Sequence, residues 1–254
     1  MKVLRAPHAV ELFHLAFLQV LQSRLDHDHY ILKGGTNLRY FFESVRYSED
    51  IDLDTAGIER FELEEKVDGV LGSPAMAALL RAGGLAVDRV SKPKQTETTQ
   101  RWKLALARAG RDDEPPLRTK IEFSRRNGDE RHLLEAVPAR IVDPYAMRSP
   151  TVRHYDAEAA IGQKVDALAL RSETQARDVF DLDLLLRPRP ALAAAFPAAR
   201  RRSAAERASE LSFADFAAQV RPFLDPEVAE LYADANAWEQ MRGFVVARLL
   251  ESPQ

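Results

Sequence analysis

The chain has 254 residues, of which 46% are hydrophobic and 30% are charged, a composition typical of a globular protein with one large or two small domains. It contains no cysteine, which excludes disulfides, thiolate metal sites and cysteine nucleophiles. The net charge of −3 is not that of a protein held to nucleic acid mainly by its electrostatic field, so a basic surface would have to be local. Arg187, Arg189 and Arg200 to Arg202 are candidates for it, although such arginines are often only solvated helix ends.

No apolar run reaches the roughly 18 to 20 residues needed to cross a bilayer. The first residues also lack the apolar stretch and the small-residue cleavage site of a signal peptide. We therefore expect no membrane segment and a cytoplasmic location.

The first 150 residues predict a mixture of helices and strands, because helical spacing of apolar residues alternates with short runs of strand formers. In chain order, the expected elements are helix 7–26, strand 30–32, a helix over 37–42 capped by Thr36, strand 50–54, a helical region over 58–83 broken near Gly72, strands 85–90, 99–107 and 117–124, and a further strand over 133–142.

From about Asp156 onward the pattern is helical, and Pro144 and Pro150 mark a boundary before it. The expected helices are 156–171, 173–187, 191–202, 213–223 and 226–250. We therefore predict an α+β fold class, with a mixed β-sheet flanked by helices in residues 1–150 and an all-helical bundle in residues 151–254.

The most informative segment is an acidic strand. Asp50, Asp52 and Asp54 occupy alternate positions, so their side chains share one face. Neighbouring carboxylates repel each other unless a cation lies between them, and Mg²⁺ prefers oxygen ligands and keeps positions open for substrate phosphates. Two carboxylates that hold metal ions over a nucleoside triphosphate (NTP) are suited to an in-line displacement at phosphorus.

A glycine pair precedes this strand. Gly34 and Gly35 allow the backbone to approach a phosphate closely, the helix that follows offers free N–H groups, and Thr36 adds a hydroxyl. Each feature alone has an ordinary explanation, since a Gly-Gly pair is often just a turn and an acidic edge strand often prevents aggregation. Together they indicate one compact phosphate and metal site.

The order and spacing of these residues resemble the nucleotidyltransferase fold of the DNA polymerase β superfamily, whose signature is a hydrophobic residue, Gly-Gly or Gly-Ser, a gap of about a dozen residues and Asp-x-Asp. More closely, KGGTNLR at 33–39 and RYSEDIDL at 46–53 resemble the AbiEii/AbiGii toxin family. That family contains nucleotidyltransferase toxins of abortive-infection and toxin–antitoxin systems, including mycobacterial toxins that modify tRNA.

The resemblance implies roles for individual residues. Asp50 and Asp52 would bind Mg²⁺ or Mn²⁺, and a third carboxylate would come from a neighbouring strand. Glu122 is the best candidate for it, the alternative being a solvent-facing Glu on a half-buried strand. Gly34, Gly35 and Thr36 are expected to cradle the phosphates. Ser48, Arg171 and Asp181 are expected to contact the nucleotide, and Lys33, Arg39 and Arg46 either to contact it or to pin the loop.

A second segment resembles the family's downstream motif, K-x-x-A-L-x-x-R followed by R-D-x-x-D-L. Lys164, Arg171, Arg177, Asp178 and Asp181 occupy its positions. In the family, the Lys contacts the triphosphate and the Asp after Arg helps to complete the active site. A charged face of a helical bundle is the alternative for Arg171 and Asp181, and an Arg177–Asp181 salt bridge is also plausible.

On one straight helix, Lys164 and Asp178 would lie about 21 Å apart, at 1.5 Å per residue, and could not reach one phosphate group. The residues Ser172 to Gln175 fit a capping box, with Ser172 as N-cap. We therefore predict a helix that ends near Arg171 and a second helix that begins at Glu173 and folds back, so that Lys164 and Asp178 converge.

Ser48 lies two residues before Asp50. A phosphate on Ser48 would add negative charge beside the metal-binding carboxylates and should block nucleotide binding. We hold this as a hypothesis about regulation.

The resemblance implies a toxin that transfers a nucleoside monophosphate (NMP) from an NTP to an RNA, most simply the 3′ end of tRNA. It also implies a cognate antitoxin and a role in phage defence. Two alternatives remain open from the sequence: a nucleotidyltransferase that modifies a small molecule or a protein, and a non-catalytic nucleotide-binding module.

Overall fold

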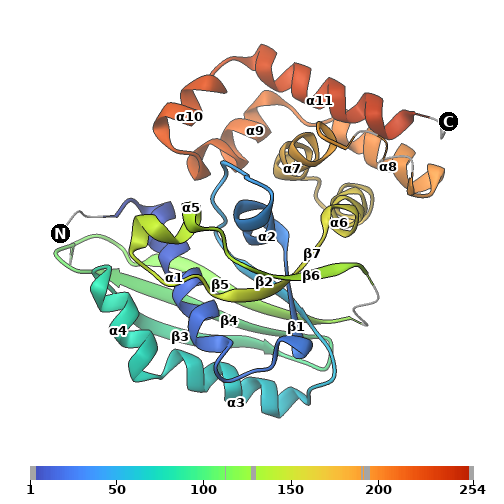
Figure 1. Cartoon of the computed structure of the whole chain (residues 1–254). Helices are drawn as coiled ribbons and strands as arrows, with labels where there is room; N and C mark the ends of the chain where they lie inside the picture. Colours follow the sequence, from blue (N-terminus) through green and yellow to red (C-terminus); the bar gives the residue numbers. More distant parts are fainter. Residues whose placement is uncertain (1–3, 112, 127–129, 190, 192–194, 252–254) are drawn as a thin grey trace. The chain divides into compact units, whose positions relative to one another are not determined.

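The computed structural model describes residues 4–111, 113–126, 130–189, 191 and 195–251. Its contacts divide the chain into two compact units (Figure 1). The first unit comprises Met1–Phe41 and Tyr47–Tyr155, and the second comprises Phe42–Arg46 and Asp156–Gln254. The short segment Phe42–Arg46 thus belongs to the second unit, although both of its neighbours in sequence belong to the first.

The first unit is built on a mixed sheet in which the strands follow the order β3-β4-β5-β2-β1-β7-β6. The central strands β1 and β2 are antiparallel, whereas β2 pairs in parallel with β5 and β1 in parallel with β7. Segments far apart in sequence therefore lie side by side, as β2 and β5 do in Figure 1. The strands are β1 Tyr30–Lys33, β2 Ile51–Thr55, β3 Leu85–Gln95, β4 Thr99–Arg108, β5 Leu117–Arg125, β6 His132–Ala136 and β7 Thr151–Tyr155.

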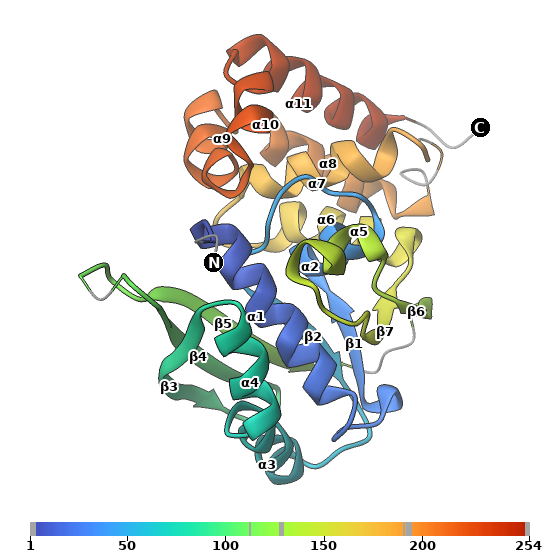
Figure 2. The same ribbon diagram turned by 60° about the vertical axis from the view of Figure 1, so that its left-hand side comes forward.

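Helices of the first unit cover one face of the β3–β5 part of this sheet (Figure 2). The apolar side chains of α1 and those on alternate positions of β4 and β5, such as Trp102, Leu104 and Ile121, form one buried core between helices and sheet. Because alternate residues of a strand point to opposite faces, the residues between these core positions lie on the other face. The helices of this unit are α1 Ala6–Leu21, α2 Gly34–Phe41, α3 Arg60–Leu71, α4 Pro74–Ala82 and α5 Ala139–Val142, with short 3₁₀ turns at His27–His29 and Asp143–Tyr145.

The second unit is helical, and its longest helix packs against α7 and α8. Its core includes an aromatic cluster in which the rings of Phe216 and Trp238 stack with centroids 5.0 Å apart. The helices are α6 Ala157–Leu170, α7 Ala176–Leu186, α8 Ala198–Ser209, α9 Phe213–Gln219, α10 Pro226–Leu231 and α11 Ala235–Leu250, with a 3₁₀ turn at Arg221–Phe223.

The expected mixed sheet flanked by helices is present, but three details of the first unit differ from expectation. Strand β7 had not been predicted; its five residues pair with β1 and β6. The region 133–142 is not one strand, because Pro138 ends the extended run and starts α5. Helix α1 ends at Leu21 rather than near residue 26. After Leu21, the amide groups of three residues turn back onto the carbonyl oxygens of Val20 and Leu21.

The helical half also departs from expectation in three places. Helix α7 begins at Ala176 rather than at Glu173. The range 226–250 contains two helices, because Asp234 caps a new one with its carboxylate. Helix α8 begins at Ala198, directly after Pro197, and so starts later than the predicted 191–202; part of that range lies outside the described residues.

Candidate active site

Asp50 directly precedes β2 and Asp52 is the second residue of that strand, and a cation lies between their carboxylates. The ammonium of Lys120, on β5, lies 2.7 Å from Oδ2 of Asp50 and 3.7 Å from Oδ1 of Asp52. The backbone N–H of Lys120 also donates to Oδ1 of Asp50 at 3.1 Å. The two carboxylates therefore face the same space, as the alternation predicted, and that space attracts positive charge.

The charge of Lys120 is maintained by these neighbours. Burial by itself would lower the pKa of the Lys120 ammonium, but the carboxylates of Asp52 and Asp50 outweigh it and raise the pKa. Lys120 therefore stays protonated at neutral pH. Lys120 was not among the residues expected at the site, although it lies two residues before Glu122 on the same strand and so shares a face with it.

Glu122 lies directly beside Asp52, because the two are partners in the parallel register of β2 and β5. Its carboxylate accepts from the guanidinium of Arg101, on β4, at 2.6 Å. Among the described residues, no three His, Asp or Glu side chains come together as a metal site; Glu122 is turned to Arg101. Even so, the donors present are carboxylate oxygens around a cation, and such donors fit a hard ion such as Mg²⁺.

The glycine turn touches the carboxylate pair. Gly34 has a φ of +69°, and a Cβ added to it would lie 3.2 Å from Oδ2 of Asp52. A side chain at this position would therefore be strained by the backbone and would also crowd the carboxylate. Helix α2 begins at Gly34 itself, so the first residue of this helix lies beside Asp52.

Two hydroxyl groups fix the backbone of Asp50. The hydroxyl of Thr36 donates to the carbonyl oxygen of Asp50 at 2.9 Å, and the hydroxyl of Ser48 donates to the same oxygen at 2.8 Å. Thr36 is inside α2 rather than its N-cap, so that prediction was wrong: its hydroxyl holds the acidic strand instead of a helix end.

Asp54, the third acidic residue of the strand, is buried and has other partners. It forms an ion pair with Lys33 and accepts from the Tyr155 hydroxyl at 2.8 Å. Burial and the negative charge of Asp54 together raise the pKa of Tyr155, so the phenol stays a hydrogen-bond donor. Lys33 thus ties β1 to β2 through Asp54.

Arg39 points toward α1. Its guanidinium forms an ion pair with Glu11 at 2.8 Å and lies 4.1 Å from the ring centre of Tyr47. Glu11 also accepts from the Tyr145 hydroxyl at 2.7 Å. Through its ion pair with Glu11, Arg39 ties α2 to α1.

The second unit holds its own network of charges. The ammonium of Lys164 lies 2.9 Å from Asp178 and 2.6 Å from Asp181, and all three side chains are buried. Arg46 binds Asp181 through two guanidinium nitrogens, with its closest contact at 2.9 Å. Asp181 therefore pairs with Lys164 and Arg46 rather than with Arg177, the alternative partner that the sequence suggested.

This network confirms that the chain breaks between α6 and α7 and folds back. Lys164 and Asp178 are in contact instead of about 21 Å apart as on one helix. The capping-box prediction was wrong, because Gln175 accepts from the Arg171 guanidinium at 3.0 Å rather than capping a helix from position N3. Arg171 also reaches Asp178 at 2.5 Å, which draws the end of α6 toward α7.

The cations control the charge of Asp181. Complete burial would raise the pKa of its carboxyl, but Arg46 and Lys164 outweigh burial and lower the pKa. Asp181 is therefore ionised at neutral pH. A buried carboxylate with two cationic partners is a rigid arrangement, because removal of either partner would leave charge uncompensated.

The family model described as "Nucleotidyl transferase AbiEii toxin, Type IV TA system" matches residues 16–248. Among solved structures, the fold is similar to that of JHP933 from Helicobacter pylori, with a TM-score of 0.62 and 19% identity over 98% of this chain and 94% of that one. It is also similar to MenT4, the nucleotidyltransferase toxin Rv2826c from Mycobacterium tuberculosis H37Rv, with a TM-score of 0.57 and 18% identity over 96% of this chain and 84% of that one. No curated protein matches the sequence.

No helix in the described part of the chain is both long enough and apolar enough to span a bilayer. The family match covers most of the sequence, including the glycine turn, the acidic strand and the Lys164 network. The chain belongs to the AbiEii family of nucleotidyltransferase toxins of type IV toxin–antitoxin systems.

Proposed function

We propose that this protein transfers an NMP from an NTP to a hydroxyl of an RNA, with the 3′ end of tRNA as the acceptor. The acceptor oxygen forms a bond to the α-phosphorus, the bond between that phosphorus and the oxygen bridging to the β-phosphate breaks, and pyrophosphate leaves. The hydroxyl proton passes to solvent or to a nearby carboxylate. No oxidant or further reactant is needed.

The carboxylate pair beside the glycine turn is the observation that supports this proposal most. Asp50 and Asp52 face one space that already attracts the Lys120 ammonium, and the Gly34 backbone lies against Asp52. Mg²⁺ or Mn²⁺ would be held there by Asp50 and Asp52, with Glu122 released from Arg101, and would supply charge neutralisation for the phosphates. The backbone of Gly34 and Gly35 and the hydroxyl of Thr36 would orient the phosphates.

We further propose that residues 151–254 form a helical domain that contributes Lys164 and Asp178 to the same active site as residues 1–150. The family's downstream motif supports this. So does chain connectivity, since Arg46 binds Asp181 and lies only four residues before Asp50. In this arrangement Lys164 would neutralise phosphate charge, and Arg171 and Asp181 would hold Lys164 and Asp178 in place.

The biological setting follows from the family. Type IV membership implies an antitoxin partner, and we propose cytoplasmic RNA as the target and phage defence as the role. Transfer of an NMP to the acceptor end would block aminoacylation of tRNA and so arrest growth.

The test is to incubate the purified protein with each α-labelled NTP, Mg²⁺ and bulk tRNA. We expect label from one preferred NTP to enter RNA, and we expect Asp50→Asn to abolish this. Asp88→Asn is the matched control, because Asp88 is an exposed carboxylate on β3 of the same sheet. Label found only in protein or in a small molecule would show that the acceptor is that molecule rather than RNA. No labelled product of any kind with wild-type protein would contradict the enzymatic proposal.

Lys164→Met tests the contribution of the helical domain in the same assay. It should lower the rate of NMP transfer by about 100-fold or more, because the triphosphate loses the ammonium that would neutralise it. Lys66→Met, on α3, should leave the rate unchanged. Equal activity of the two variants would exclude Lys164 from the active site. A circular dichroism melt separates loss of chemistry from loss of folding.

A further inference from the structure

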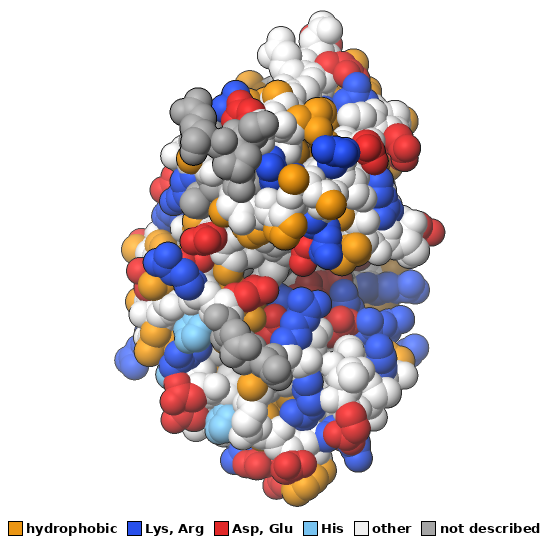
Figure 3. Space-filling model, turned by 90° about the vertical axis from the view of Figure 1, so that its right-hand side faces the viewer, with side chains coloured by type: hydrophobic (Ala, Val, Ile, Leu, Met, Phe, Trp, Pro, Cys, Tyr) orange, Lys and Arg blue, Asp and Glu red, His pale blue; other side chains and the backbone are white. Residues whose placement is uncertain are grey.

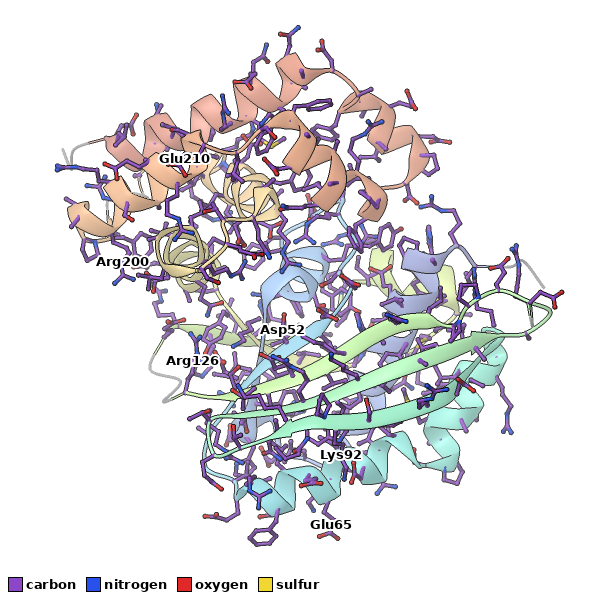
Figure 4. All side chains as sticks on the ribbon, turned by 180° about the vertical axis from the view of Figure 1, so that it is seen from behind. Asp52, Glu65, Lys92, Arg126, Arg200 and Glu210 are labelled. Atoms are coloured by element: carbon purple, nitrogen blue, oxygen red, sulfur yellow. The ribbon has the colours of Figure 1, made fainter. Side chains whose placement is uncertain are left out.

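A row of positive charge leads away from the carboxylate pair across the face of the sheet that the unit's helices leave uncovered. The strands β5, β4 and β3 lie in front of α1 in Figure 4, between the labelled Asp52 and the labelled Lys92. The register aligns Lys120 with Lys103 and then with Ser91 on these three strands. One step further along the strands, it aligns Arg118 with Ala105 and Arg89. All these residues occupy the positions that alternate with the core.

Three of these cations are available for a ligand. Arg89, Lys103 and Arg118 are exposed, and none of them forms an ion pair with another described residue. By contrast, Lys120 is held by Asp50 and Arg101 by Glu122. In a protein of net charge −3, cations without acidic partners on one face form a local positive field. Figure 3 shows one side of the molecule, where Lys and Arg side chains stand among Asp and Glu side chains.

The three cations also share an open pocket with the candidate active site. The pocket has a volume of about 370 Å³. Its polar lining comprises Glu49, Asp50, Arg89, Ser91, Lys103, Arg118, Thr119 and Lys120. Its acidic residues are confined to the end at β2, and its cations extend outward over β5, β4 and β3. A ligand in this pocket would therefore meet the carboxylates of Glu49 and Asp50 at one end, and the charged side chains that it meets at the other end are all positive.

We propose that this surface, Arg89, Lys103 and Arg118, binds the phosphate backbone of the acceptor RNA. The inference rests on the proposed function, because it takes the acceptor to be RNA. The reacting hydroxyl must reach the carboxylate pair, so the phosphates next to it must lie on an adjoining surface. Adjacent strands are about 4.8 Å apart, so cations from β5 to β3 extend roughly 14 Å from β2. This length suits several consecutive phosphates and exceeds what a small acceptor would use.

The experiment measures binding of fluorescein-labelled bulk tRNA to the full chain by fluorescence anisotropy, without NTP and over a series of KCl concentrations. The test variant is Arg89→Gln/Lys103→Gln/Arg118→Gln. The matched control is Arg24→Gln/Lys66→Gln/Arg81→Gln, which removes the same charge from α3, α4 and the turn after α1, on the helix-covered side. All six positions are solvent-accessible, and a thermal melt checks that both variants fold.

We expect the test variant to bind tRNA about tenfold or more weakly than wild type. The plot of the logarithm of the binding constant against the logarithm of salt concentration has a negative slope, and the magnitude of this slope should decrease by about 2 to 3. This is close to one for each phosphate that the variant no longer neutralises. The control variant should change affinity by less than about twofold. Wild-type affinity in the test variant, or equal weakening in both variants, would overturn the proposal, as would failure of wild-type protein to bind tRNA. If the test variant binds tRNA like wild type but loses binding to an acidic protein, the proposal is also overturned, because the surface would then bind a protein partner instead of RNA.

The labelling assay separates this inference from the proposed function. If wild-type protein labels tRNA and the test variant labels it equally well at low tRNA concentration, the surface assignment fails and the function stands. If tRNA binds through this surface but receives no label, the surface assignment stands and the proposed function fails.

Discussion

Lys120 binds Asp50 twice, with its backbone N–H 3.1 Å from Oδ1 and its ammonium 2.7 Å from Oδ2. The same ammonium lies 3.7 Å from Asp52. A lysine thus neutralises the pair of carboxylates from within the protein. Since a divalent ion would occupy the same region, the two cations should compete for these oxygens.

We therefore predict that Lys120→Met strengthens binding of Mn²⁺ by the protein without nucleotide. Removal of the ammonium leaves two carboxylates facing each other, and their repulsion is relieved by a bound metal. Isothermal titration should show a lower Kd for Mn²⁺ than in wild-type protein, whereas Lys103→Met, on the neighbouring strand, should leave the Kd unchanged. Weaker or equal binding in Lys120→Met would show that the lysine does not compete with the metal.

Gly34→Ala should abolish transfer with only a moderate loss of stability. The added methyl would lie 3.2 Å from Oδ2 of Asp52, and the alanine would have to keep the left-handed φ of +69° that Gly34 already has, which costs about 1–2 kcal/mol for a residue other than glycine. A small displacement of a reacting group can cost roughly 100-fold in rate.

Gly110→Ala is the matched control for Gly34→Ala. Gly110 has a similar φ of +74°, but its added Cβ would meet nothing within 4 Å. Both variants should lose comparable stability in urea unfolding, and only Gly34→Ala should lose transfer. Full activity in Gly34→Ala would mean that the turn does not set the position of Asp52.

Ser48 offers a test of regulation. Ser48→Ala should keep most activity, because the Thr36 hydroxyl still donates to the Asp50 carbonyl that both residues hold. Ser48→Glu should lose nearly all transfer, since a negative charge close to Asp50 opposes binding of a triphosphate. The initial rate of labelling measures both variants, and equal activity of Ser48→Glu and Ser48→Ala would end the hypothesis that a phosphate at this position silences the protein.

The burial of His14 leads to a prediction of how the stability of the protein depends on pH. Complete burial lowers its pKa from 6.5 to about 3, and its Nε2 lies 2.9 Å from the Thr119 hydroxyl. Between these pH values the unfolded chain binds a proton that the native protein does not, so this residue makes the protein less stable as the pH falls below about 6.5. The expected slope approaches about 1.4 kcal/mol per pH unit.

Urea unfolding at pH 7.0 and 5.0 checks this prediction with His14→Gln as the comparison. Gln does not titrate, so the stability of wild type should fall relative to the variant by about 2 kcal/mol over this interval. Parallel pH profiles for the two proteins would show that His14 is not the group responsible.

The strands around the site could be predicted because their chemistry is local. Asp50 and Asp52 share a face by strand alternation alone, and Gly34 ends β1 because a backbone with positive φ favours glycine. The break between α6 and α7 could be predicted as well, since Lys164 and Asp178 could not otherwise share a site.

Features that depend on pairing between distant segments could not be read from the sequence. The register of β5 against β2 decides that Lys120 meets Asp50 and that Glu122 meets Asp52, and strand spacing in the sequence does not fix it. The predictions of two helix caps were wrong for a related reason. Thr36 and Gln175 had plausible local roles as capping residues. In the folded chain, Thr36 instead donates to the carbonyl oxygen of Asp50, and Gln175 accepts from the Arg171 guanidinium.

The central claim is that Asp50 and Asp52 support transfer of one NMP from an NTP. It is tested most directly by measuring pyrophosphate release and labelled tRNA in the same reaction, for wild-type protein and for Asp52→Asn. The account predicts that wild type forms both products in equal amounts and that Asp52→Asn forms neither while remaining folded. Undiminished formation of both products by folded Asp52→Asn would contradict it.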